Sequence, residues 1–119
     1  MEDIIVGIKL FNDADFFSAH DYFESKWVEC QQKDRLFFQG LVQISVGCYH
    51  LVCGNYKGAL SQLNKGKTKL INYLPSYKNI DLKNLLSGVD TLINDLNCYF
   101  SGELVSIDLT KIPKIHIQN

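Results

Sequence analysis

The chain has 119 residues, of which 46% are hydrophobic and 21% are charged, and its formal net charge at pH 7 is -1. A chain of this length and composition is typical of one globular domain with a single core. The nearly balanced charge argues against a general affinity for nucleic acid or for acidic membranes. The four cysteines show no zinc-binding spacing, and their apolar neighbours favour free thiols in a reduced, cytoplasmic compartment.

Apolar residues recur with the 3.6-residue period of an α-helix along most of the chain. We expect five helices, whose approximate ranges in chain order are 3–11, 13–31, 35–53, 56–73 and 81–101. The predicted N-terminal caps of the second, third and fifth helices are Asn12, Asp34 and Asp81. Gly54 marks a tight break between two helices, and Pro75 ends the fourth.

The longest uncharged run covers residues 36–56, a length that could span a membrane. Its glutamine, histidine and glycine residues instead favour a central helix of a small bundle. The tail over 103–119 alternates like a strand but has no partner, so we expect an extended arm packed on the bundle. The sequence therefore predicts one all-α domain over 1–119, a compact bundle of four to five helices with antiparallel neighbours.

Polar side chains occur on helix faces that otherwise read as apolar. At 100° per residue, His20 and Glu24 share an arc of the second helix with aromatic residues. Glutamine and histidine residues form a narrow stripe on the third helix, which a short loop makes an antiparallel neighbour. We expect the two sets to meet inside the bundle. The candidate residues, including one from the following turn, are His20, Glu24, Trp27, Gln39, Gln43, His50 and Asn55.

Three interpretations of this cluster stay open, because unpartnered buried polar groups cost roughly 1–3 kcal/mol each. The first is a buried hydrogen-bond network, which would suit a structural or noncatalytic protein-interaction module. The second is a pocket that binds a small polar ligand or acts on it, with Glu24 as a base of raised pKa. The third is a divalent-metal site made by His20, Glu24 and His50. The sequence does not decide whether the protein is an enzyme.

No partner is evident from the sequence, and a homo-oligomer is compatible with it. Lysines concentrate in residues 57–83, whereas acidic residues concentrate in residues 1–34. We interpret these groups as two complementary solvated faces of one bundle. The alternative, an anion or nucleic-acid contact through Lys57, Lys65 and Lys69, lacks the arginines and interleaved aromatic residues of such surfaces.

The segments FNDADFFSAHDYFESKW and RLFFQGLVQISVGCYHLVCGNYKGALSQLNKG together resemble the domain of unknown function 309 family. The resemblance covers about residues 8–75. The positions that carry it are Phe11, Asn12, Phe16, Ala19, His20, Glu24, Trp27, Gln39, Gly40, Leu41, Gln43, His50, Gly54, Asn55, Gly58 and Ala59. It implies a small, all-helical protein of the bacterial cytoplasm or the plastid stroma, and it implies no reaction.

Overall fold

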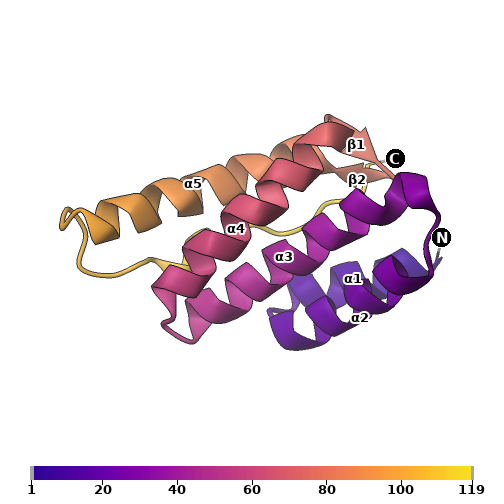
Figure 1. The fold of residues 1–119 in the computed structure, drawn as a ribbon. Helices are drawn as coiled ribbons and strands as arrows, with labels where there is room; N and C mark the ends of the chain where they lie inside the picture. Colours follow the sequence, from indigo (N-terminus) through magenta and orange to yellow (C-terminus); the bar gives the residue numbers. More distant parts are fainter. Residues whose placement is uncertain (1, 119) are drawn as a thin grey trace.

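The computed structural model describes residues 2–118. Within this range the structure is a bundle of five α-helices, which confirms the predicted all-α fold (Figure 1). The helices are α1 (Glu2–Asn12), α2 (Phe16–Glu29), α3 (Arg35–Val52), α4 (Tyr56–Leu70) and α5 (Leu82–Phe100). None of the described helices has both the length and the apolar character needed to cross a lipid bilayer.

Short elements connect and follow these helices. Three 3-10 turns cover Gln32–Asp34, Ile71–Tyr73 and Leu109–Lys111. A small antiparallel hairpin, which the sequence did not predict, joins β1 (Ser76–Tyr77) to β2 (Ile80–Asp81) ahead of α5. Its turn residues, Lys78 and Asn79, both have positive φ angles. The hairpin is too short to show the alternating pattern from which strands are recognised.

The helix α3 is the central element, as its uncharged sequence predicts. It packs against α2 on one side and α4 on the other, while α1 packs on α2 and α5 on α4 (Figure 1). The contact with α4 is very close: a Cβ atom on Gly40 would lie 2.7 Å from Cγ of Leu70. A Cβ atom on Gly66 would lie 3.0 Å from the carbonyl oxygen of Gly40. Glycine at these positions therefore sets the distance between the two helices.

Helix caps agree with the sequence in part. The side chains of Asn55 and Asp81 accept hydrogen bonds from the backbone N–H groups three residues on, which starts α4 and α5. Asn12, predicted to cap the second helix, is instead the last residue of α1, and Asp15 caps α2. Asp34 precedes α3, but its side chain makes no capping bond.

The C-terminal tail lies along the bundle, as predicted for an extended arm. Ile107 and Ile115 are buried, and the Asn12 side chain bonds both backbone groups of Ile115. Asn12 Nδ2 donates to the Ile115 carbonyl at 2.9 Å, and its Oδ1 accepts from the Ile115 N–H at 2.7 Å. The tail also forms one isolated bridge, Ile80 to Ile117, so it does find a strand partner at its end.

All four cysteines are free thiols. Cys48 is buried in the core, and burial raises the pKa of its thiol to about 12. Cys53, at the end of α3, is exposed. The thiols thus differ strongly in their access to solvent.

Candidate functional site

The helix α2 turns a different face to the core from the one predicted. Its buried residues are Phe16, Ala19 and Phe23. The Glu24 side chain is exposed and His20 is half-buried, so the expected position of Glu24 in the interior is wrong. Phe17, which made this arc read as apolar, is itself 56% exposed. The candidate residues of α2 therefore lie at the outer edge of the bundle.

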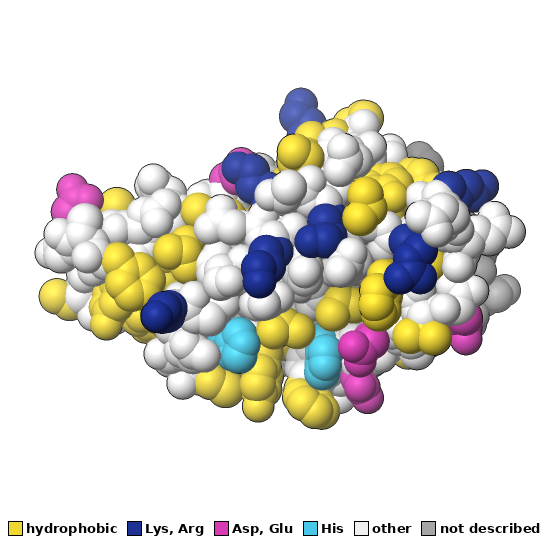
Figure 2. All heavy atoms as spheres, in the orientation of Figure 1, with side chains coloured by type: hydrophobic (Ala, Val, Ile, Leu, Met, Phe, Trp, Pro, Cys, Tyr) yellow, Lys and Arg dark blue, Asp and Glu magenta, His cyan; other side chains and the backbone are white. Residues whose placement is uncertain are grey.

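The candidate residues of α3 form a continuous stripe on its outward side. We call Gln39, Gln43, Val46 and His50 the α3 stripe; all four side chains are half-buried. The stripe lies between α2 and α4, the two helices that flank α3. Figure 2 shows this side of the molecule, with two histidine side chains, acidic groups beside one of them, and Lys or Arg side chains along α4. The stripe is thus a surface feature and not part of the core.

The two histidines make separate local contacts. His20 Nδ1 donates to the carbonyl oxygen of Phe17 at 2.6 Å. His50 Nδ1 accepts from the Asn55 amide nitrogen at 3.4 Å, while Asn55 Oδ1 accepts from the Gly58 N–H. Asn55 therefore caps α4 and orients His50, a link between two candidate residues that the sequence did not predict.

Aromatic side chains lie beside these polar groups. The exposed Phe17 ring lies 5.0 Å from the His20 ring and 5.7 Å from the Tyr49 ring, between centroids, and so connects α2 to α3. At the other end of α2, the guanidinium carbon of Arg35 lies 4.7 Å from the centre of the Trp27 ring. Arg35 and Tyr49 therefore also belong to this surface, although the sequence did not indicate either residue as part of a site.

The predicted hydrogen-bond network does not form. Among the described residues, no hydrogen bond joins the polar side chains of α2 to those of the α3 stripe. Trp27 Nε1 and Gln43 Oε1 are both buried and have no hydrogen-bond partner. Each unmet group costs on the order of 1–3 kcal/mol. The first interpretation, one buried network that joins the two helices, is therefore wrong: His50 and Asn55 bond to each other, but Trp27 Nε1 and Gln43 Oε1 are left without a partner.

The predicted metal ligands are divided by the structure. One turn of α2 brings His20, Asp21 and Glu24 together, with one ligand atom of each within 4.8 Å of the others. His50 does not belong to this group. Asp21 does, although the sequence did not indicate it as a metal ligand. Both carboxylates are exposed, and solvated acidic groups of this kind are common without a metal. Metal binding here stays a prediction.

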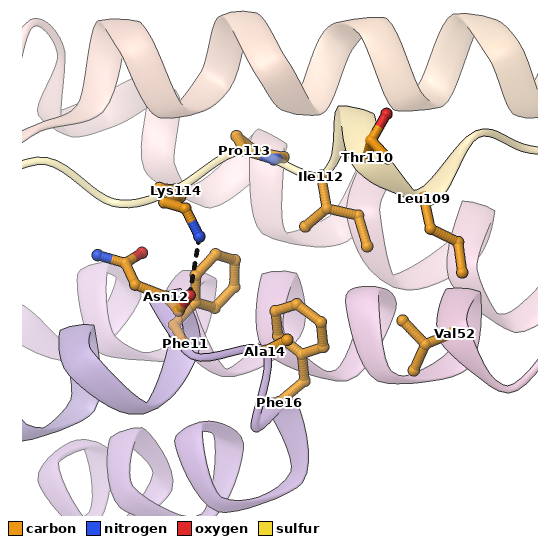
Figure 3. A pocket seen from close by; sticks show the side chains of 10 residues that line it. All are labelled: Phe11, Asn12, Ala14, Phe16, Val52, Leu109, Thr110, Ile112, Pro113 and Lys114. Carbon is orange, nitrogen blue, oxygen red and sulfur yellow. Dashed lines mark hydrogen bonds between the residues drawn. The ribbon is translucent and has the colours of Figure 1, made fainter.

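Two pockets lie away from the candidate residues. One is a cavity of about 280 Å³ between the α1–α2 turn, the end of α3 and the tail (Figure 3). The other, of about 540 Å³, is open and lies on the outer face of α5. Neither is lined by any of the predicted site residues. The α3 stripe is accordingly an open surface on which one buried polar atom, Gln43 Oε1, has no hydrogen-bond partner.

Comparison with family models finds a match for the part of the chain that carries these residues. Residues 4–62 match the family described as Domain of unknown function (DUF309). The match covers α1, α2, α3 and the first half of α4, and it includes every candidate residue. It confirms the resemblance seen in the sequence over the larger part of its predicted extent. No curated protein matches the chain.

Proposed function

We propose that this chain, which belongs to the DUF309 family through residues 4–62, is a noncatalytic interaction module that binds an extended peptide segment along the α3 stripe. The observation that carries the proposal is the unpartnered amide oxygen of Gln43 on a half-buried, outward-facing stripe. An open surface of this kind is accessible to a peptide chain. Neither of the two described pockets is lined by residues of the stripe.

Side-chain amides suit a peptide partner because each carries both a donor and an acceptor, as a backbone peptide group does. Gln39 and Gln43 are four residues apart, which corresponds to about 6 Å along a helix. Peptide groups that face the same side of an extended chain repeat every two residues, or about 6.6 Å. Both amides can therefore bond to one extended segment that runs along α3.

The unmet oxygen of Gln43 makes binding favourable in a second way. In the free protein this acceptor is covered and unbonded, at a cost of roughly 1–3 kcal/mol. Rotation about the last side-chain bond would turn the oxygen toward a peptide N–H. A ligand that induces this rotation removes a penalty already present in the free protein. The Gln43 side chain would therefore both destabilise the free protein and strengthen binding of the peptide.

Exposed rings at the edge of the stripe supply an apolar contact. Phe17 and Tyr49 are 56% and 39% exposed, and their rings lie against each other across the α2–α3 junction. Large exposed rings that are already held in place lose little conformational freedom on binding. We expect an apolar side chain of the bound segment to cover them, while the amides of the stripe bond its backbone.

A peptide selection tests the proposal directly. Peptides enriched from a random dodecapeptide phage library on the wild-type protein would be synthesised, and their affinities measured by fluorescence anisotropy. We expect Gln43→Leu and Gln39→Leu to weaken binding by about tenfold each, which corresponds to about 1.4 kcal/mol. Asn97→Leu, an exposed position on α5, is the matched control and should leave affinity unchanged.

Stability measurements separate loss of binding from loss of structure. Gln43→Leu removes the unmet oxygen, so its free energy of unfolding in urea should equal or exceed that of the wild type. Binding that weakens in a protein of undiminished stability would support the proposal. Peptides whose affinity ignores both glutamine substitutions, or a selection without enrichment, would rule it out.

A further inference from the structure

The cavity beneath the C-terminal tail has the composition of a ligand site, and it shares no residue with the α3 stripe (Figure 3). We call it the tail cavity. We propose that it binds a small monocarboxylate that carries one aromatic ring. This inference concerns a second site and does not rest on the proposed peptide binding.

The walls of the tail cavity are apolar and come from segments far apart in the sequence. Phe11 and Phe16 are buried side by side, with ring centroids 5.0 Å apart at 71°, an edge-to-face arrangement. Figure 3 shows Ile112 of the tail and Val52 of α3 directed into the same space. An aromatic ring placed there would meet the edges and faces of two rings already fixed in orientation.

The rim carries apolar groups that remain in contact with water. Val52 is 43% exposed and Leu109 is 44% exposed, although both line the cavity. Burial of apolar area is worth about 25 cal/mol per Å². In the protein alone these two side chains stay partly exposed to water. A ligand with an apolar body would cover both of them.

One charge lies at one end of this apolar space. Lys114 is the only charged residue among the ten that line the cavity. Its Nζ donates to the carbonyl oxygen of Asn12 at 2.9 Å, a bond drawn in Figure 3. An ammonium group has three donors, so two remain for a ligand, and the Asn12 bond holds the charge near the cavity. A single anionic group on the ligand is the complement of this arrangement.

The volume limits the size of the ligand. A cavity of about 150 Å³ is sufficient for benzene. The tail cavity, at about 280 Å³, has room for one ring and a short acidic side chain. The neighbouring Lys111 is paired with Asp95 at 3.2 Å and does not line the cavity, so it offers a matched control for charge.

The test is an NMR titration of the ¹⁵N-labelled protein with 3-phenylpropionate and, separately, with its neutral amide, 3-phenylpropionamide. We expect saturable shifts at the backbone amides of Phe16, Thr110 and Ile115. The carboxylate should bind about tenfold more tightly than the amide, because a hydrogen bond to a charged group is the stronger one. Lys114→Met should abolish this preference while it leaves the affinity for the amide unchanged, and Lys111→Met should retain the preference.

A cavity-filling variant tests the location of the site. Val52 is partly exposed at a helix end, so Val52→Phe can project into the cavity without disturbing the core. It should prevent binding of both probes, with a melting temperature close to that of the wild type. Equal binding of the acid and the amide by the wild type would overturn the proposal. So would a preference that survives Lys114→Met, or shifts that do not saturate.

Discussion

At the scale of single residues, the buried carboxyl group of Asp34 has the most distinctive surroundings. It accepts a hydrogen bond from the Tyr77 hydroxyl at 2.6 Å and pairs with Lys78 at 3.2 Å. Burial would raise its pKa, but the hydrogen bonds from Tyr77 and Lys78 and the charges of Lys78 and Lys33 outweigh burial and lower it. The hydrogen bond to Asp34 also raises the pKa of Tyr77, to about 12. Asp34 thus fastens the start of α3 to the hairpin.

The lowered pKa of Asp34 predicts how stability depends on acid. A carboxyl group whose pKa is lower in the folded state contributes stability above its unfolded pKa, and this contribution is lost as the pH falls through the folded value. The folded pKa of Asp34 lies below the ordinary value of an aspartate, so the stability is lost on the acid side. The free energy of unfolding in urea should fall less steeply with acid in Asp34→Asn than in the wild type.

At neutral pH the same variant should be less stable by roughly 1–3 kcal/mol, because Lys78 and Tyr77 lose an ionised partner. Asp13→Asn provides the control, since Asp13 is largely exposed and its ion pair with Lys9 is solvated. Parallel acid profiles of the wild type and Asp34→Asn would show that the Asp34 contacts do not form in solution.

The exposed position of Glu24 gives a second prediction at this scale. Glu24→Gln should change the free energy of unfolding by no more than about 0.5 kcal/mol, as surface substitutions usually do. Thermal and urea unfolding at pH 7 would measure this difference. A loss of several kcal/mol would mean that the carboxylate is ionised and paired in a buried position, which would contradict its exposure in this structure.

The candidate residues themselves could be found from the sequence, but their surroundings could not. The helical period correctly groups His20 with Glu24, and Gln39 with Gln43. It cannot decide which edge of an aromatic arc faces the core. That choice depends on α1: a Cβ atom on Gly7 would lie 2.6 Å from the Phe23 ring, so the missing side chain lets α1 cover that flank of α2.

At the scale of elements, the contact between α3 and α4 depends on glycines. A Cβ atom on Gly66 would lie 2.7 Å from Cδ1 of Ile44 and 3.0 Å from the backbone oxygen of Gly40. The Ile44 side chain could rotate away from such a Cβ atom, but the backbone of Gly40 could move only together with its helix. Gly66→Ala should therefore destabilise the protein by about 1–3 kcal/mol despite the better helix propensity of alanine.

Ser61→Ala on the exposed face of the same helix is the control, and it should be neutral or slightly stabilising. Chemical denaturation of both variants would give the comparison. If Gly66→Ala were as stable as Ser61→Ala, the two helices would have to lie farther apart in solution than they do in this structure.

Element boundaries were predictable where one cap residue stood alone. Asp81 follows a break and precedes a periodic run, and it caps α5 as predicted. Asn55 stands in the same position before α4 and caps it, although the sequence predicted only a break there. Between α1 and α2, Asn12 competes with Asp15 for the same role. The choice is made by a contact with Ile115, which lies 103 positions away in the chain, so no local pattern could reveal it.

At the scale of the whole molecule, the tail closes the bundle by bonding back to its first helix. Asn12→Ala removes both bonds to the Ile115 backbone, and the cost should be roughly 1–3 kcal/mol. Hydrogen exchange of the Ile115 N–H should become faster, since its acceptor is lost. Asn97→Ala, on the exposed surface of α5, should change neither quantity.

Unchanged exchange at Ile115 in Asn12→Ala would show that the tail is held by apolar burial alone. The sequence predicted that the tail packs as an extended arm, because its β-branched residues have no adjacent strand. The sequence did not indicate which residues hold the arm. The bonds between Asn12 and Ile115 join segments near the two ends of the chain, and such contacts leave no periodic pattern.

The difference between Cys48 in α3 and Cys53 directly after it has a practical consequence for the study of the α3 stripe. Cys48 is sealed and protonated at neutral pH, whereas Cys53 is open to solvent three residues beyond His50. A maleimide dye or nitroxide should therefore attach to Cys53 far faster than to Cys48. The natural chain thus carries an attachment point for a spectroscopic reporter beside one end of the α3 stripe.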